Sequence, residues 1–180
     1  MIIHINGMPG VGKYTVAKVL AEALPARLID NHLVIDLVVS ICGRDSPQYI
    51  PTVNKINKVV HDVIVSKPKN ETIIFTNALT QELSEDKERL KIIETLADKM
   101  EVPFVPILLY CEQEENTKRL TNSERKNKGK LMDENILKDL LKTYTITHDQ
   151  DHSNSIEIDT SALTAKQTAK AVIAQLPPNY

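Results

Sequence analysis

The sequence predicts a single α/β domain in which helices cover both faces of a parallel β-sheet. Two observations predict this class: five short apolar runs are typical of buried strands, and stretches with apolar residues at helical spacing separate them. The length of 180 residues is also near that of one domain, so we expect one domain over residues 1–180.

In the first half of the chain, short apolar runs alternate with helical patterns. The run 2–6 stops at Gly7, as expected of a strand that is buried on both faces. Apolar residues then recur at helical spacing until Pro25 ends the pattern, which predicts a helix over 12–24. By the same reasoning the next expected elements are a strand at 27–30, helices at 31–41 and 52–66, and a strand at 72–76.

The second half repeats this alternation. Ser84 is the expected N-cap of a helix that runs to residue 100, and Thr164 with Gln167 forms a capping box for the last helix. Between them we expect strands at 102–111 and 155–159 and helices at 112–120 and 133–144.

Composition and charge exclude several classes of protein. With 22 basic and 24 acidic residues the net charge is −2, which argues against a surface built for nucleic acid. No apolar run approaches the roughly 18–20 residues that span a bilayer, and the first residues do not form a signal peptide. The two cysteines have no zinc-site spacing. We expect a reduced, cytoplasmic protein, monomeric or homodimeric, without nucleic-acid or membrane partners.

A glycine-rich loop follows the first expected strand and opens the first expected helix, which is the context of a phosphate-binding loop. The glycines allow a tight turn that points successive N–H groups at phosphate oxygens, and the helix N-terminus adds partial positive charge. Lys13 is expected to reach the β- and γ-phosphates. The loop consists of Gly7, Met8, Pro9, Gly10, Val11, Gly12, Lys13, Tyr14 and Thr15.

One position departs from the usual loop. Tyr14 directly follows the lysine, where a serine or threonine hydroxyl normally binds Mg²⁺, and a hydroxyl comes only at Thr15. A phenol is bulky and is held further from the backbone, so direct Mg²⁺ binding by Tyr14 is not expected. Either Mg²⁺ is held by the nucleotide, water and another acid, with Thr15 and Asp30 as candidate ligands, or catalysis is impaired.

The start of the chain, from Met1 to Lys13, resembles the small P-loop kinases, which include shikimate kinase, gluconate kinase, chloramphenicol phosphotransferase and the tunicamycin-resistance ATP-binding protein. The specific match covers about the first fifteen residues, and the remainder is similar in element order. The resemblance implies a three-layer P-loop NTPase fold with strand order 2-3-1-4-5 and a short lid at about 121–132. It also implies ATP and Mg²⁺ as cofactors and phosphoryl transfer to a small molecule.

Ligands collect at the carboxyl ends of the strands in an open parallel sheet, which points to the end of the second strand. Kinases of the shikimate type carry an acid there, and a second acid two residues later handles the acceptor hydroxyl. Asp30 matches the first acid, whereas His32 replaces the second. We expect Asp30 to orient the hydroxyl or the metal, and His32 to act as a base or substrate ligand. The alternative is that Asp30 only caps the next helix.

Three further residues are candidate ligands of the acceptor. Asp36 lies one helical turn beyond His32. Asn77 follows the third strand and could hydrogen-bond the acceptor, although a turn residue bonded to its own backbone is an equal alternative. Arg44 could bind an anionic acceptor, although a lone arginine beside an acid is more often a surface charge.

A basic segment at 117–130 holds six basic residues and one acid. A solvated loop or an RNA-binding run could have this composition, but the segment has no aromatic residue to stack a base. Lid arginines of small kinases neutralise charge on the transferring phosphoryl group. The resemblance assigns Arg119 to nucleotide contact, and Arg125 is the candidate phosphate clamp. The resemblance also implies that the loop containing Ser161 lies beside the adenine.

These observations predict an ATP-dependent kinase that phosphorylates a hydroxyl of a small molecule, with Lys13, Asp30, Arg119 and Arg125 as its catalytic candidates. Two alternatives stay open. The first is a nucleotide-binding sensor without transfer activity, which Tyr14 and His32 favour because both depart from the catalytic pattern. The second is a nucleoside or nucleotide kinase, which uses the same chemistry on another acceptor.

Overall fold

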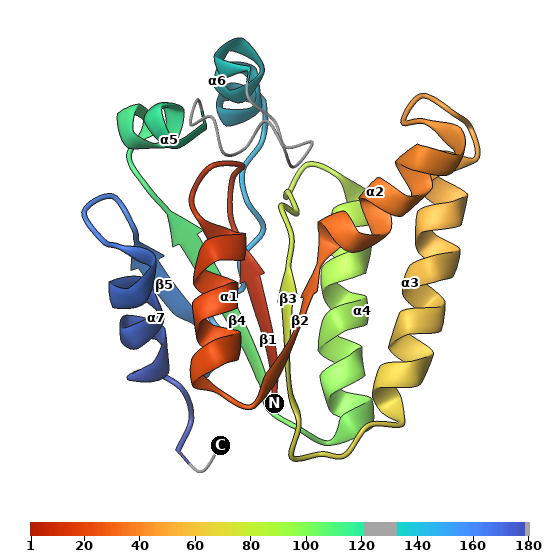
Figure 1. The fold of residues 1–180 in the computed structure, drawn as a ribbon, viewed down its shortest axis with the longest axis vertical. Helices are drawn as coiled ribbons and strands as arrows, with labels where there is room; N and C mark the ends of the chain where they lie inside the picture. Colours follow the sequence, from red (N-terminus) through yellow and green to blue (C-terminus); the bar gives the residue numbers. More distant parts are fainter. Residues whose placement is uncertain (121–132, 179–180) are drawn as a thin grey trace.

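The chain folds into a five-stranded parallel sheet between two layers of helices (Figure 1), as described by the computed structural model for residues 1–120 and 133–178. The strands are β1 (Ile2–Asn6), β2 (Ala26–Asp30), β3 (Thr72–Thr76), β4 (Phe104–Tyr110) and β5 (Ile156–Asp159). The sheet order is β2-β3-β1-β4-β5, which confirms the order 2-3-1-4-5 that the resemblance implies.

The described residues contain seven helices, which connect the strands or follow the last one (Figure 1). They are α1 (Lys13–Ala23), α2 (Asn31–Cys42), α3 (Tyr49–Val65), α4 (Ser84–Met100), α5 (Gln113–Leu120), α6 (Glu134–Thr143) and α7 (Ala165–Ile173). None of the helices in these ranges is both long and apolar enough to cross a membrane.

Alternate residues of the central strands feed two separate cores. Ile3 and Ile5 of β1 belong to a core shared with α1 and α7, while Ile2 belongs to a core shared with α3 and α4. All five residues of β1 are buried, and so are all five of β3, because parallel strands are covered by helices on both faces. The sheet therefore holds the loop after β1 rigidly at its carboxyl edge.

The helix ends show where sequence reasoning was accurate and where it was not. Thr164 and Gln167 form the expected capping box of α7. Ser84 was expected to cap α4, but it is the first residue of that helix, and its hydroxyl bonds to Glu85. The N-cap position is taken by Leu83, so the expectation for Ser84 was wrong. A serine one residue inside a helix can bond its neighbour in place of the helix N–H groups.

Candidate active site

The loop at residues 7–15 joins the end of β1 to the start of α1, which begins at Lys13. Its backbone needs glycine at two positions of positive φ, Gly10 (φ 101°) and Gly12 (φ 99°), the second of which is the N-cap of α1. At Gly10 a side chain would also collide with a neighbour, since an added Cβ would lie 2.0 Å from the Oδ1 of buried Asn116. The loop is therefore a tightly supported turn, as a phosphate-binding loop requires.

The side chain of Lys13 lies over this loop. Its Nζ donates to the carbonyl oxygens of Gly7 at 2.6 Å and of Met8 at 3.0 Å. These bonds fold the lysine back toward the glycines that would surround a phosphate group. The ammonium group therefore lies next to the place where phosphate charge would lie.

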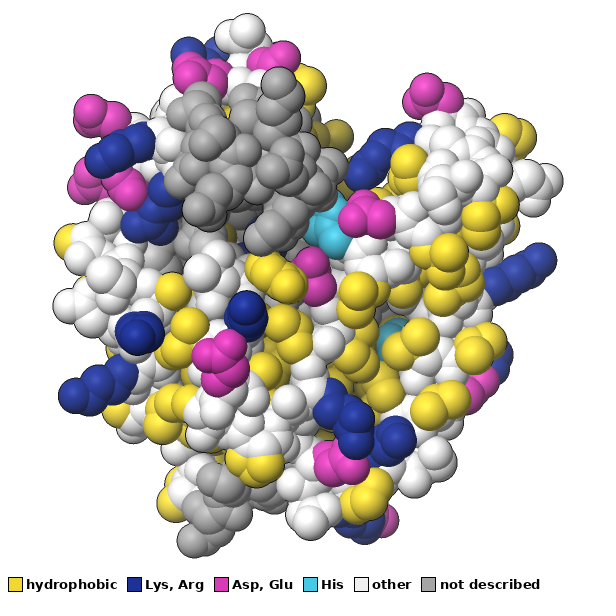
Figure 2. Space-filling view, in the orientation of Figure 1, with side chains coloured by type: hydrophobic (Ala, Val, Ile, Leu, Met, Phe, Trp, Pro, Cys, Tyr) yellow, Lys and Arg dark blue, Asp and Glu magenta, His cyan; other side chains and the backbone are white. Residues whose placement is uncertain are grey.

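A cavity of about 540 Å³ opens beside the loop and brings together residues from four parts of the chain. One side, the phosphate-loop side, is formed by Pro9, Gly10, Gly12, Lys13, Tyr14 and Thr15. The opposite side, the α2–α6 side, is formed by Asp30, Asn31, His32, Ile35, Arg44, Ala78, Ile136 and Leu140. This volume lies within the roughly 300–1,000 Å³ of sites that bind small molecules. On the face drawn in Figure 2, a histidine, acidic and basic side chains gather near α2.

Asp30 ends β2 on the α2–α6 side, and its side chain is held by the neighbouring strand. Thr76, the residue paired with Asp30 across β2 and β3, donates its hydroxyl to the Asp30 carboxylate. Asp30 occupies the N-cap position of α2, yet in the described structure its side chain makes no capping bond to that helix. Capping alone therefore does not account for this acid, which is only 8% exposed at the cavity wall.

His32 also lines the cavity, and Asp36 supports it from one turn further along α2. The His32 Nδ1 lies 3.2 Å from the Asp36 Oδ1. A carboxylate at Nδ1 favours the tautomer with its proton there, which leaves Nε2 able to accept a proton. Asp36 is exposed and lies outside the described cavity lining, so it contacts the cavity only through His32.

Asn77 is directed toward the central strand. Its Oδ1 lies 3.1 Å from the Nε2 of His4, and the cavity wall next to it is formed by Ala78 among the described residues. Burial lowers the pKa of His4 to about 4, against the opposing effect of the Asn77 hydrogen bond. His4 is therefore neutral at pH 7 and hydrogen-bonded in the core. Contact between Asn77 and an acceptor stays a prediction.

Arg44 lies at the cavity mouth, beyond the end of α2, and is exposed. Within the described part of the chain it makes no ion pair, although Asp45 follows it directly in the sequence. Its positive charge is thus available to the cavity. The Tyr14 and Thr15 side chains border the same space from the first turn of α1.

Arg119 joins the phosphate loop to the loop after β5. Its NH1 donates to Thr160 Oγ1 at 2.9 Å, and its NH2 donates to the Thr160 carbonyl at 2.6 Å, while Glu115 accepts from Nε at 2.7 Å. Thr160 Oγ1 donates in turn to the Val11 carbonyl at 3.2 Å. Arg119 therefore holds the two loops that would flank a nucleotide base, and its contact with a nucleotide stays a prediction.

Ser161 joins the same network from the loop after β5. Its hydroxyl accepts from the Glu112 N–H at 2.8 Å, and its own N–H donates to Asp159 at 2.8 Å. Hydrogen bonds from the Ser161 hydroxyl and from the Ser161 backbone N–H keep the pKa of Asp159 below its usual value. The expected adenine contact at Ser161 would therefore use the backbone.

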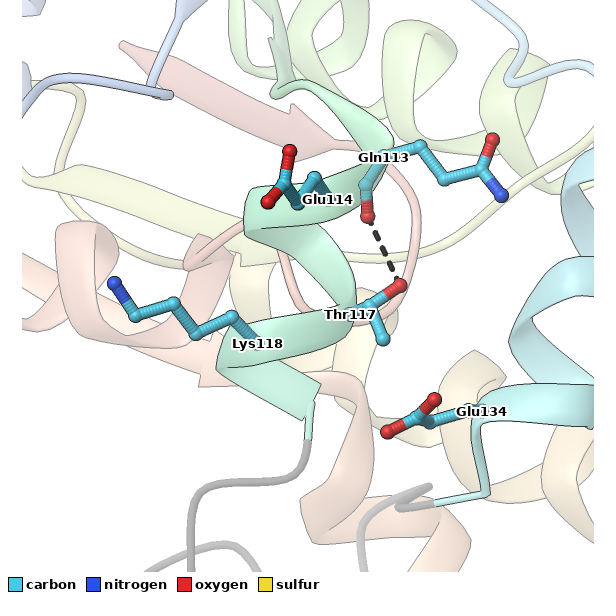
Figure 3. Close-up of a pocket in the computed structure, with 5 residues that line it drawn as sticks. All are labelled: Gln113, Glu114, Thr117, Lys118 and Glu134. Atoms are coloured by element: carbon cyan, nitrogen blue, oxygen red, sulfur yellow. Dashed lines mark hydrogen bonds between the residues drawn. The ribbon is translucent and has the colours of Figure 1, made fainter.

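The expected lid at about 121–132, including Arg125, lies outside the described residues. Among the described residues, a second cavity of about 550 Å³ lies between α5 and the first turn of α6 (Figure 3). Glu114 and Glu134 contribute two negative charges to its wall and Lys118 one positive charge, with Gln113 and Thr117 between them. A net acidic wall does not suit a triphosphate, so the phosphate-loop cavity is the better nucleotide site.

Sequence reasoning missed several residues that shape the site. Thr76, Asn116 and Thr160 each support a predicted residue from an element distant in sequence. The strand register could have suggested Thr76, because it pairs with Asp30 once β2 and β3 are placed side by side. The apolar wall formed by Ile35, Ile136 and Leu140 had no local signal, since its residues fit ordinary amphipathic helices.

The chain was compared with known proteins. A family model described as an AAA domain matches residues 3–142. A candidate kinase from Chloroflexus aurantiacus is 13% identical, with a TM-score of 0.69 over 98% of both chains. A gluconokinase from Sinorhizobium meliloti is 14% identical, with a TM-score of 0.61 over 96% of this chain and 89% of that chain.

A shikimate kinase from Acinetobacter baumannii, in complex with shikimate, is 20% identical, with a TM-score of 0.56 over 96% of this chain and 90% of that chain. None of the curated proteins matches. At these identities the solved structures are similar in fold. The chain belongs to the AAA domain family, and its fold is that of the P-loop small-molecule kinases.

Proposed function

We propose that the protein is a kinase that transfers the γ-phosphoryl group of ATP to a hydroxyl of a small molecule. The observation that carries this proposal is the shared cavity, which Lys13 lines from one side and Asp30 and His32 from the other. Phosphoryl transfer depends mainly on placing donor and acceptor together and stabilising the charge between them. A single cavity with a phosphate loop and a supported acid is suited to that task.

Each side of the cavity has a role in this reaction. Lys13 leaves the carbonyl oxygens of Gly7 and Met8 to bind the β- and γ-phosphates, and it follows the charge as the phosphoryl group moves. Asp30 accepts a hydrogen bond from the acceptor hydroxyl and orients that oxygen for attack. Thr76 fixes the carboxylate in place, as a positioned base requires.

His32 offers a second route for the hydroxyl proton. Its bond to Asp36 leaves Nε2 as the proton-accepting nitrogen, and its side chain borders the same cavity as Asp30. Asp36 thus serves as a positioning residue for His32. The hydroxyl proton leaves to Asp30 or His32 as the new phosphate ester bond forms and the bond to ADP breaks.

Mg²⁺ fits this site through Asp30 and Thr15. The ion prefers oxygen ligands and usually takes one or two from protein, with the remainder from phosphates and water. Asp30 and Thr15 both line the cavity that contains Lys13, so an acid and a hydroxyl would be available as ligands without a serine or threonine at residue 14. The bound ion supplies positive charge to the β- and γ-phosphate oxygens.

The remaining candidates would bind the ends of the two substrates. Arg44 would bind an anionic group of the acceptor, and gluconate and shikimate, named with two of the similar structures, are both hydroxylated carboxylates. Asn77 would add a hydrogen bond through its amide group. Arg119 and the backbone at Ser161 would flank the nucleotide, and Arg125 would clamp its phosphates.

One observation favours a second function, a nucleotide sensor that binds ATP without transferring its phosphate. Tyr14 stands where the loop usually supplies a metal-binding hydroxyl, and this phenol borders the cavity. A nucleoside or nucleotide kinase is a further form of the proposed activity. It differs only in the acceptor that lies on the α2–α6 side.

The proposal is tested by following γ-phosphate from ATP·Mg²⁺ onto a panel of hydroxylated acids, sugars, nucleosides and antibiotics. We expect Mg²⁺-dependent transfer to at least one class. In that reaction Asp30→Asn should lower kcat by about a hundredfold while ATP affinity changes little. Asp98→Asn, an exposed acid on α4, is the matched control and should leave turnover unchanged.

ATP binding with no transfer to any class would favour the sensor. Unchanged turnover in Asp30→Asn would remove Asp30 from the reaction.

A further inference from the structure

The α2–α6 side of the cavity combines polar groups with an apolar wall. Asp30 and His32 lie there with Arg44, but Ile35 of α2 and Ile136 and Leu140 of α6 border the same space. Polar groups alone would suit a sugar acid with hydroxyls on every face. The apolar wall therefore indicates a property of the acceptor that the polar residues do not indicate.

The apolar wall begins next to the residue that would handle the hydroxyl. Ile35 follows His32 by three positions on α2, so the two side chains share one face of the helix. Both line the cavity, and both are half-buried. A molecule whose hydroxyl reaches His32 or Asp30 must therefore place its adjoining atoms against Ile35.

Helix α6 completes the wall from the other side. Ile136 and Leu140 are four residues apart and share one helix face, while Leu137 between them is fully buried and anchors the helix. Ile136 remains 48% exposed at the cavity. Covering an exposed isoleucine at a cavity wall with an apolar ligand lowers the free energy of the complex.

Helix α6 is capped at its first turn and is bonded to another part of the fold beyond its last turn. At the first turn Asp133 accepts from the N–H groups of Asn135 at 2.8 Å and of Ile136 at 3.3 Å. Beyond the last turn, the Gln81 N–H donates to the carbonyl of Thr145 at 2.8 Å.

The segment after α6 is also bonded to the strand that carries the phosphate loop. The Thr147 N–H donates to the Leu79 carbonyl at 2.9 Å, and the Asn6 side chain donates to the Leu79 carbonyl at 3.0 Å and to the Thr147 carbonyl at 2.8 Å. Asn6 ends β1, directly before the loop. The wall is thus built at a set distance from the phosphate-binding loop.

We propose that the acceptor carries an apolar group, the size of an aromatic ring or short branched chain, beside the hydroxyl that receives phosphate. This group lies between Ile35 of α2 and Ile136 and Leu140 of α6. The inference rests on the proposed function, because it assigns the same cavity to the acceptor. The volume of about 540 Å³ accommodates such a group together with the terminal phosphate of a nucleotide.

The test uses pairs of compounds that differ in the apolar group. One pair is 3-phenyllactate and lactate, and the other is uridine and ribose, so that hydroxy acids and nucleosides are distinguished as sources of the ring. Binding is measured by calorimetry in the presence of AMPPNP and Mg²⁺, which needs no turnover. We expect the ring-bearing member of at least one pair to bind about tenfold more tightly or better.

Two variants locate this preference. Ile136→Ser should reduce the preference for the ring about tenfold or abolish it, whereas Ile173→Ser, an exposed isoleucine on α7, should preserve it. Leu140→Ser provides a second change in the wall, and AMPPNP binding by each variant checks that the site is folded.

Equal binding within both pairs, including no detectable binding, overturns the inference, as does a preference that survives in both wall variants. The proposed kinase function fails on a different result, the absence of transfer to every acceptor class. Loss of AMPPNP binding only in the wall variants would also count against the inference, because the wall would then support the nucleotide.

Discussion

The two sides of the cavity differ in construction: one is formed mainly by backbone and the other by side chains. The phosphate-loop side is a short stretch of residues whose backbone N–H groups would bind phosphate, with Lys13 as its charged side chain. The α2–α6 side is made of side chains from β2, α2, the loop after β3 and α6. A backbone cradle suits a phosphate group that every member of a kinase family must bind. Side chains on several elements can change independently, so in the proposed function they would set which acceptor is used.

The largest effect is expected from removing Lys13, the charged side chain of the phosphate loop. Lys13→Met should lower transfer by about a hundredfold or more, because the developing phosphate charge loses its nearest cation. The thermal midpoint should remain close to that of the wild type, because the hydrogen bonds from Lys13 to the carbonyl oxygens of Gly7 and Met8 lie within the loop itself. Transfer is measured with labelled ATP and folding by circular dichroism.

Lys18→Met, an exposed lysine on the same helix, is the control and should retain activity. Full activity in Lys13→Met would show that the loop does not work through its lysine.

The difference between the contiguous phosphate loop and the dispersed side chains of the α2–α6 side explains which parts of the site could be predicted from sequence. The phosphate loop was identified because its residues are contiguous, and their spacing alone predicts a backbone conformation. Asp30 was predicted as a site residue because ligands lie at the carboxyl ends of parallel strands, and it lines the cavity. Its bond to Thr76 depends on the register between two strands that are 46 residues apart in sequence, which no local pattern encodes.

The α6 wall was missed for a related reason. Ile136 and Leu140 have the spacing of any amphipathic helix, and only the tertiary fold shows that their face meets the cavity and not the core. The element order was predictable from periodicity, and the sheet order came from the resemblance. Asn77 also bonds a buried histidine that no local pattern pairs with it, and its contact with an acceptor stays a prediction.

A smaller effect, on the free energy of unfolding, should distinguish the cost of a side-chain collision at Gly10 from the cost of backbone strain alone. Gly10→Ala is expected to lower the free energy of unfolding by about 2–5 kcal/mol, because it adds a collision with Asn116 to a positive φ. Gly43→Ala has only the positive φ (76°), since nothing lies within 4 Å of its added Cβ, and should cost about 1–3 kcal/mol. Both are measured by urea denaturation.

ATP affinity should fall in Gly10→Ala and stay unchanged in Gly43→Ala, which lies at the end of α2. A similar loss of stability in both variants would mean that Asn116 moves aside without cost.

The effect that is smallest at pH 7 concerns the strand beneath the loop, because it appears only in acid. The buried His4 has a pKa of about 4, whereas an unfolded histidine titrates near 6.5. Between these values the unfolded chain binds more protons than the folded one, so stability falls as the pH drops from about 6.5 to 4. The loss from His4 should approach about 3 kcal/mol and be absent at pH 7.

His4→Gln removes this titration while keeping a group that can hydrogen-bond Asn77. The unfolding free energy of the wild type should therefore fall more steeply with decreasing pH than that of the variant, as measured by urea titrations at several pH values. Parallel curves would mean that His4 is protonated in the folded protein with little penalty. A positive charge would then lie beneath the phosphate loop, close enough to Lys13 for the two charges to repel, and the loop would bind anions more tightly in acid.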